Sequence, residues 1–374
     1  MNHPKTLVTG ATGKTGGAVA RLLLAQGWPV RALVRRQDPR SESLARLGAE
    51  VVVGDLFDVD ALCEALQGVQ RAYYVPPLAP YMAQAALAFA AAARQSRLEL
   101  VVQLSQWLSH RHHPAISTRE TWLVDELFAM LPGVAHITVN PGMFADNFLR
   151  VIDFATLLHL YPVLMGDSKS APVSNEDIAR VAVAALMRPE RHLGQRLRPT
   201  GPALLDGREM AAAIAGVLGH RVTPVDLPTW LFRRAARLSG ASRHEVYSLV
   251  AYMQDHRAGA FSWQGGVTDV VLRLTGTPAE SFATTAARYA ALPFARATLA
   301  NRLSSVLRFA ITPLTVGFDL AAYEREMGFP QPTQPSQSLD DARWVSEHQA
   351  QMGAVRTAAC APLAPARPEL APAR

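Results

Sequence analysis

The chain has 374 residues, of which 49% are hydrophobic and 18% charged, so it can bury a large core and cannot be disordered throughout. Its net charge is +6, yet only three of the 37 basic residues are lysines: Lys5, Lys14 and Lys169. The arginines occur singly or in pairs among acidic residues. Because no cationic run is present, the composition argues against a nucleic-acid partner.

Cysteines and apolar runs give no sign of secretion, of a metal site or of a membrane span. Cys63 and Cys360 lie far apart and lack the paired spacing of metal ligands or of a disulfide framework. The apolar stretch after Met1 is too short for a secretory signal. The longest apolar windows, 82–93 and 154–166, fall short of the roughly 18 residues that cross a bilayer. We therefore expect a cytoplasmic protein.

The first 140 residues alternate short apolar runs with helical stretches. The expected strands are 5–9, 30–34, 50–53, 72–75, 98–104 and 135–139. The expected helices between them are 16–26, 58–66, 81–95 and 117–130. This alternation predicts an α/β fold with a doubly wound parallel sheet, the Rossmann type, whose ligand crevice lies at the carboxyl ends of the strands.

After residue 150 the pattern becomes mostly helical. We expect a dinucleotide-binding domain over 1–150, with later returns from about 170–200, and a smaller helical substrate lobe over 151–291. Residues 292–374 form a C-terminal extension, of which the Ala- and Pro-rich part 359–374 is expected to be disordered. Its amphipathic stretch 299–309 could pack on the body, form a dimer surface or cover the pocket.

A glycine-punctuated turn follows the first expected strand. Gly10, Gly13 and Gly16 allow a tight turn, close approach of a pyrophosphate and close packing of the helix on the strand. The helix that opens there offers free N–H donors to an anion. The same loop contributes Thr12, Lys14 and Thr15, and the whole segment predicts a dinucleotide site.

The end of the second strand bears on the choice of cofactor. NAD sites usually place an acidic residue there, whereas this strand runs into Arg35 and Arg36, which suit a 2′-phosphate. NADP(H) is therefore preferred, with Lys14 as a further cation, and nearby Asp38 keeps NAD(H) possible. Three more cofactor contacts are expected at later strand ends, from Asp55, Leu56 and Pro76.

Together these segments resemble the NmrA-like branch of the atypical short-chain dehydrogenase/reductase superfamily. The resemblance rests on TGATGKTG at 9–16, on 30–36, on Gly54-Asp55, and on the later segments 140–147, 172–179 and 275–289. It spans about residues 5 to 291. It implies a Rossmann fold and an NAD(P) cofactor. That branch contains NADPH-dependent quinone and aromatic-substrate reductases, but also redox-sensing regulators that bind the dinucleotide without turnover.

The proton relay of that superfamily is incomplete in this chain. The resemblance matches Ser105 to the serine at the end of the fifth strand, but Thr118 and Trp122 stand where a tyrosine and a lysine are expected. No lysine of the chain follows a tyrosine by four residues. The proton must come from elsewhere, or the acceptor must need little acid help, as a quinone does.

The remaining candidates lie around the expected crevice. Ser105 and His113 are the candidate catalytic residues, the latter from a histidine-rich loop that could equally be a polar surface. The expected substrate pocket consists of Trp107, Met143, Phe144 and Asn147. We hypothesise an NADP(H)-dependent oxidoreductase that passes hydride to a small apolar, quinone-like or aromatic substrate, in a chain that could form a homodimer. The alternatives are a non-catalytic NAD(P)-sensing protein and an epimerase, isomerase or lyase that uses the cofactor transiently.

Overall fold

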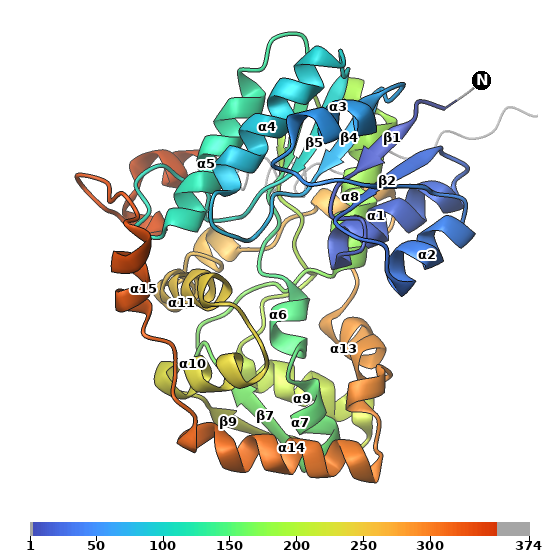
Figure 1. Ribbon diagram of the computed structural model, residues 1–374. Coiled ribbons are helices and arrows are strands. Elements are labelled where there is room, and N and C mark those ends of the chain that lie inside the picture. The colour runs from blue at the N-terminus through green and yellow to red at the C-terminus, as the bar shows by residue number, and fades with distance from the viewer. Residues whose placement is uncertain (1–2, 350–374) are drawn as a thin grey trace, which may run out of the picture.

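The computed structural model describes residues 3–349 and contains one large parallel sheet (Figure 1). Its seven strands, in the spatial order 3-2-1-4-5-6-8, are all parallel. They are β1 (Thr6–Val8), β2 (Val30–Val34), β3 (Glu50–Val53), β4 (Arg71–Tyr74), β5 (Leu100–Leu104), β6 (Ala135–Val139) and β8 (Arg196–Leu197). The order reverses beside β1, which confirms the predicted doubly wound Rossmann sheet.

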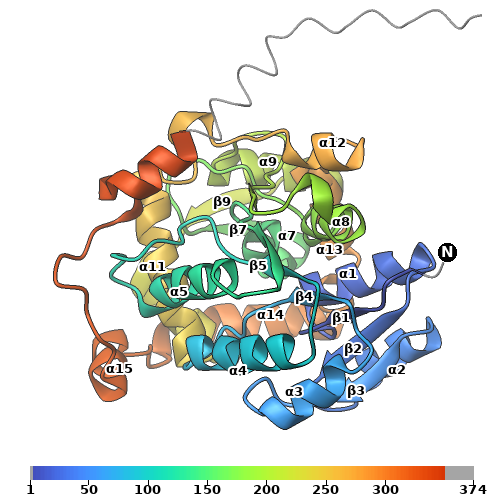
Figure 2. The same cartoon turned by 90° about the horizontal axis from the view of Figure 1, so that it is seen from above.

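Helices cover both faces of this sheet, as the view from above shows (Figure 2). One face carries α1 (Lys14–Ala25), α8 (Asn175–Met187) and α12 (Val270–Thr275). The other carries α3 (Val59–Leu66), α4 (Met82–Gln95) and α5 (Ile116–Ala129). The inner strands are buried on both faces, and for that reason their sequences are mostly apolar and do not alternate regularly, although Arg31 and Gln103 interrupt β2 and β5.

One helix of this half was missed at the sequence level. Helix α2 (Pro39–Arg46) follows β2, and its N-cap is Asp38, whose carboxylate accepts the backbone N–H groups of Arg40 and Ser41. Pro39 occupies the first helical position, where its lack of an N–H costs nothing. The Asp-Pro pair is a helix-start signal that was readable in the sequence.

The lobe below the sheet is mostly helical and has a core of its own (Figure 1). Its helices are α6 (Ala145–Leu149), α7 (Ile152–Leu158), α9 (Gly207–Leu218), α10 (Thr229–Leu238), α11 (Arg243–Ala258) and α13 (Phe282–Ala290). A small parallel sheet accompanies them, made of β7 (Leu160–Val163) and β9 (Thr223–Asp226). Single 3-10 turns lie at Pro189–Arg191, Trp263–Gly265, Pro293–Ala295, Thr312–Leu314 and Ser338–Asp340.

The C-terminal extension packs along the body as α14 (Leu299–Ile311), α15 (Leu320–Met327) and a helical stretch over 342–349. Trp344, 1% exposed, donates its indole N–H to the carbonyl of Trp107 at 3.1 Å and thereby joins the lobe core. The predicted disordered segment 359–374 lies outside the described residues. Among residues 3–349, no helix combines the length and the apolar character that crossing a bilayer requires.

Candidate active site

A cavity of about 960 Å³ opens at the carboxyl ends of β1, β2, β4 and β5 and continues between the sheet and the lobe. Most residues predicted for the cofactor or the substrate line it, although they come from six separate chain segments. These are Gly10, Thr12, Gly13, Lys14, Thr15, Arg35, Arg36, Leu56, Pro76, Ser105, Met143, Phe144 and Asn147. The predicted residues Gly16, Asp55, Trp107 and His113 are not in the lining.

The phosphate loop has the shape that its glycines allow. Gly10 has φ +58°, a left-handed conformation that favours glycine. A Cβ on Gly16 would lie 2.3 Å from the Gly10 carbonyl oxygen, so Gly16 shapes the loop by packing and not by facing the cavity. The N-cap of α1, Gly13, makes no side-chain cap, and the first turn has no acidic residue. The first N–H groups of α1 are thus available to an anion, and the loop fits a pyrophosphate.

Three arginines, not two, gather at the far end of the cavity. Arg35 and Arg36 are exposed in its lining together with Arg40, which sequence reasoning missed. Arg40 donates to the carbonyl of Thr12 at 3.2 Å, and through Nε and Nη2 to Asp38 Oδ2 at 3.1 and 2.6 Å. The Arg40 side chain, with the backbone N–H groups at the start of α2, lowers the pKa of Asp38 to about 2. Both oxygens of Asp38 are already hydrogen-bonded, which disfavours Asp38 as a holder of a ribose hydroxyl.

Lys14 points towards the lobe, so it does not join the three arginines as a further cation for a 2′-phosphate. It forms an ion pair with Asp146 of α6, which also accepts a hydrogen bond from the hydroxyl of Tyr289 on α13. Burial raises the pKa of Asp146, but the bonds from Lys14 and Tyr289 outweigh this and keep that pKa below its ordinary value. Asp146 therefore remains anionic and ties the phosphate loop to the lobe.

Asp55, predicted as a cofactor contact, does not line the cavity. Asp55 is exposed outside the lining, and its carboxylate accepts the backbone N–H of Phe57 at 3.1 Å in the turn after β3. Its neighbours Gly54 and Leu56 do line the cavity. The side chain of Asp55 thus stabilises the turn, while the backbone around it forms the wall.

Ser105 belongs to a buried hydrogen-bond network beneath the cavity. Its hydroxyl donates to Asp125 Oδ2 at 2.9 Å and accepts the amide of Asn140 at 2.9 Å. The same carboxylate accepts hydrogen bonds from Ser109, Gln103 and Arg196. Since the single proton of Ser105 is directed at Asp125, Ser105 can accept one further hydrogen bond from a ligand but has no proton to offer it.

We expect Asp125 to make the stability of the protein depend on pH. Burial raises its pKa to about 6 from 3.8, against the opposing influence of Arg196 and the hydroxyls. The folded state thus binds this proton more tightly than the unfolded chain, and the resulting stability, complete below about pH 4, is lost as the pH rises through about 6. Asp125→Asn removes the titration.

The free energy of unfolding of wild type, relative to Asp125→Asn, should therefore fall by roughly 2–3 kcal/mol between about pH 4 and pH 7. Urea unfolding of both proteins at the two pH values measures it. A difference that stays constant with pH would contradict the raised pKa.

The predicted acid His113 is directed away from the cavity. It is fully buried, with Nε2 2.7 Å from Asp255 Oδ2 and Nδ1 accepting the backbone N–H of Ala115. Asp255 also accepts the N–H of Ser338 from the extension. Both ring nitrogens have partners, so the structure does not support His113 as a proton donor to a ligand.

The other two histidines of this loop contact the C-terminal extension directly. His110 Nε2 lies 3.1 Å from the carbonyl of Ser336, and His112 Nδ1 lies 3.0 Å from Asp341 Oδ2. Trp107, predicted as a pocket wall, is 2% exposed and packs against Phe261 and His348. The prediction that Trp107 forms a wall of the pocket is therefore wrong. Trp107 belongs to the lobe core, because the extension covers it.

The lobe end of the cavity combines apolar side chains with an ion-paired cluster of Asp146, Arg150 and Glu245. Met143, Phe144 and Asn147 face it as predicted, opposite Leu249 and Tyr252 of α11. Burial raises the pKa of Tyr252 well above its ordinary value, so its phenol stays protonated and can donate a hydrogen bond. No motif marked α11, because nothing in its sequence distinguishes a pocket-lining helix from any other helix.

Comparison with known proteins agrees with this geometry. The model of the NmrA-like family matches residues 2–96. A curated relative, the NAD(P)H azoreductase of Xenophilus azovorans, is 31% identical over 304 residues, which are 76% of this chain and 98% of the relative. Because the relative is matched almost completely, about a quarter of this chain has no counterpart in it.

Solved structures share the fold. An NADPH-dependent quinone oxidoreductase from Escherichia coli, complexed with NADPH, superposes with a TM-score of 0.62 and 23% identity, covering 76% of this chain and 99% of that one. The negative transcriptional regulator NmrA in complex with NADP superposes with a TM-score of 0.61 and 17% identity, covering 77% and 95%. The chain belongs to the NmrA-like family of NAD(P)-binding Rossmann proteins.

Proposed function

We propose that this protein is an NADPH-dependent reductase that transfers hydride to an apolar, quinone-like or aromatic acceptor without a Tyr/Lys proton relay. Its curated relatives already place the chain among NAD(P)H-dependent oxidoreductases, in agreement with the predicted enzyme class. The observation that carries the finer proposal is the cavity itself, which runs from an arginine-rich end past the phosphate loop to a lobe end that includes Met143, Phe144 and Leu249.

The arginine end supports the preference for NADPH. Arg35, Arg36 and Arg40 can surround a 2′-phosphate with charge-assisted hydrogen bonds. The carboxylate that would favour NAD, Asp38, is held by Arg40 and by the cap of α2. The first turn of α1 would hold the pyrophosphate.

The apolar side chains Met143, Phe144 and Leu249 at the lobe end support an apolar acceptor, one that needs little acid catalysis. NADPH supplies the hydride. Ser105, which can only accept a hydrogen bond, orients a donor group such as a carboxamide N–H, and Tyr252 donates a hydrogen bond to an acceptor oxygen. Hydride addition to a quinone gives a resonance-stabilised anion, which solvent can protonate. The chain would act in the cytoplasm, where NADPH is present.

Purified protein with NADPH and a panel of quinones and azo dyes tests this proposal. We expect NADPH oxidation above the protein-free rate with at least one acceptor, and slower oxidation with NADH. Ser105→Ala should lower kcat by less than about tenfold, because Ser105 delivers no proton; proton-relay residues contribute about 10²–10⁴-fold. A loss of a thousandfold in Ser105→Ala would show that Ser105 acts as the acid.

The second candidate is a dinucleotide-sensing protein without turnover. The missing relay favours it, and so does the regulator NmrA among its structural neighbours. It predicts redox-dependent cofactor binding with no oxidation of NADPH by any acceptor of the panel. Steady turnover with one acceptor would exclude it.

A further inference from the structure

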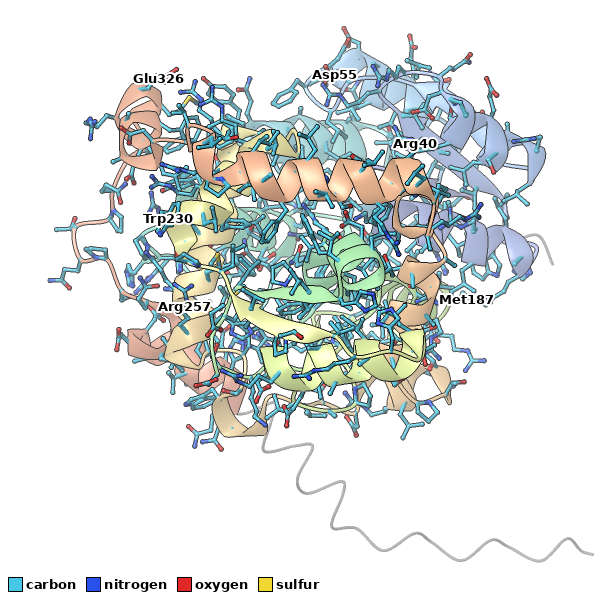
Figure 3. All side chains as sticks on the ribbon, turned by 90° about the horizontal axis from the view of Figure 1, so that it is seen from below. Arg40, Asp55, Met187, Trp230, Arg257 and Glu326 are labelled. Carbon is cyan, nitrogen blue, oxygen red and sulfur yellow. The ribbon has the colours of Figure 1, made fainter. Side chains whose placement is uncertain are left out.

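Helix α14 is amphipathic, but it lies on the body with its polar side inward. The helix forms the lower edge of the molecule in Figure 1 and runs across the face that is seen from below in Figure 3. Asn301, Ser305, Arg308 and Thr312 recur at intervals of three and four residues and thus share one side of the helix. Ser305 is 1% exposed, so this polar side is the one that contacts the protein.

A buried carboxylate explains why the polar side faces inward. Asp153 of α7 is fully buried, and its Oδ2 accepts a hydrogen bond from Ser305 at 2.9 Å and forms an ion pair with Arg308. If α14 were turned over, the carboxylate of Asp153 would lose Ser305 and Arg308. An unpaired buried charge lowers the stability of the folded state. The orientation of α14 is therefore fixed by α7.

The apolar side of α14 consequently faces solvent. Leu299, Leu303 and Leu307 are 76%, 61% and 60% exposed, and the following turn adds Leu314 and Val316 at 83% and 72%. We call these five residues, with Val306, the α14 patch. A contiguous apolar surface of this kind marks an interaction site in soluble proteins.

Arginines and a tryptophan border the α14 patch. Helix α10 is joined to the turn after α14 by Arg234, bonded to the carbonyl of Pro313, and by Arg237, bonded to that of Val316 at 3.2 Å. Trp230 of α10, 51% exposed, lies beside one end of α14 (Figure 3). Arg296 and Arg302 are exposed on the α14 side.

Acidic residues are absent from these segments. Neither 227–244 nor 281–318 contains an Asp or Glu. The nearest acidic residues along the chain are Asp226, Glu245, Glu280 and Asp319. Asp319 accepts the N–H of Ala322 as the cap of α15. The charged residues within these two segments are thus all basic, and the exposed Asp319 follows the patch residue Val316 by three positions.

This charge distribution selects the occupant. A second copy docked on the same patch would bring the arginines of both rims together, and segments 227–244 and 281–318 supply no carboxylate to offset them, so like charges disfavour such a contact. An anionic membrane surface offers phosphates to the arginines and acyl chains to the leucines. Apolar residues, tryptophan at the boundary and a basic rim are the features of helices that lie in the membrane interface.

We propose that the α14 patch docks the protein reversibly onto the surface of an anionic phospholipid bilayer, with α14 lying in the plane of the interface. Flotation of the full chain tests this with vesicles of phosphatidylcholine alone and of equal parts phosphatidylcholine and phosphatidylglycerol. We expect the protein to float with the anionic vesicles, more weakly at high salt, and to float little with phosphatidylcholine alone.

Replacing Leu299, Leu303 and Leu307 together by Ser should lower the partition coefficient by at least about tenfold, because each loses most of its apolar surface. The matched control replaces three exposed leucines of the other half of the molecule, Leu87, Leu193 and Leu272, by Ser and should float like wild type. Arg296→Glu with Arg302→Glu should abolish the preference for anionic vesicles. None of the patch residues lines the cavity, so NADPH binding can be used to check that each variant is folded.

Two outcomes would overturn the proposal. One is wild type that stays with the soluble fraction for both vesicle types. The other is a wild-type dimer, measured by sedimentation equilibrium, that becomes a monomer in the triple Ser variant, which would make the patch a contact between two copies. Neither outcome depends on whether the protein reduces quinones.

Discussion

Gly16→Ala should abolish the binding of NADPH and NADH alike. The added Cβ would lie 2.3 Å from the Gly10 carbonyl oxygen and 2.9 Å from that of Thr9, and both are backbone atoms that cannot move aside like a flexible side chain. Relieving the contact requires α1 to shift from β1, which displaces the N–H groups at the start of the helix. We expect both dissociation constants to rise by at least about a hundredfold, equivalent to roughly 3 kcal/mol.

Titration of intrinsic fluorescence with each cofactor measures this effect, and circular dichroism reports whether the variant folds. Gly216→Ala is the matched control, because its Cβ would meet nothing within 4 Å on an exposed turn of α9. It should leave binding unchanged and stabilise the helix by about 0.5–1 kcal/mol. A Gly16→Ala protein that binds NADPH like wild type would mean that the dinucleotide does not use this loop.

Arg35→Glu should weaken NADPH binding by more than about tenfold and leave NADH binding within about twofold. The change removes a charge-assisted contact to the 2′-phosphate, worth on the order of 1.5–3 kcal/mol, and adds a repulsive charge. NADH lacks that phosphate and so loses neither interaction. Isothermal titration with both cofactors gives the two ratios.

Arg46→Glu makes the same change in net charge at the exposed end of α2, outside the cavity. This variant controls for the effect of net charge on binding. It should change the affinities for NADPH and for NADH by no more than about twofold. Equal losses for NADPH and NADH in Arg35→Glu would show that Arg35 does not read the phosphate. The partner arginines Arg36 and Arg40 would then be the next to replace.

The Rossmann half could be predicted from the sequence because its signals are local. The strands 30–34, 50–53 and 135–139 match the structure residue for residue, since each is a short run with β-branched residues. The phosphate loop was readable for the same reason: its glycines meet a strand end and a helix start within seven residues.

The parts of the site that escaped prediction depend on contacts between distant segments. Tyr252 of α11 lines the same cavity as the phosphate loop, whose residues lie more than 200 positions earlier in the chain. Arg40 is the exception, because α2 begins at Pro39 after the locally readable cap Asp38. His113 and Trp107 follow a strand end, where ligand contacts are common, but a segment more than 200 residues later covers them. No local pattern announces such a contact, so position in the Rossmann unit alone placed these two side chains wrongly.

The contact between Trp344 and Trp107 ties the loop after β5 to the C-terminal extension. The loop that carries Ser105 and Gln106 into the cavity continues into Trp107, His110 and His112, which contact residues 336–348. A nascent chain that has reached the length of its relatives would still expose this indole and leave Asp255 without its bond from Ser338. In this protein the extension therefore supports the loop after β5, and with it one wall of the cavity.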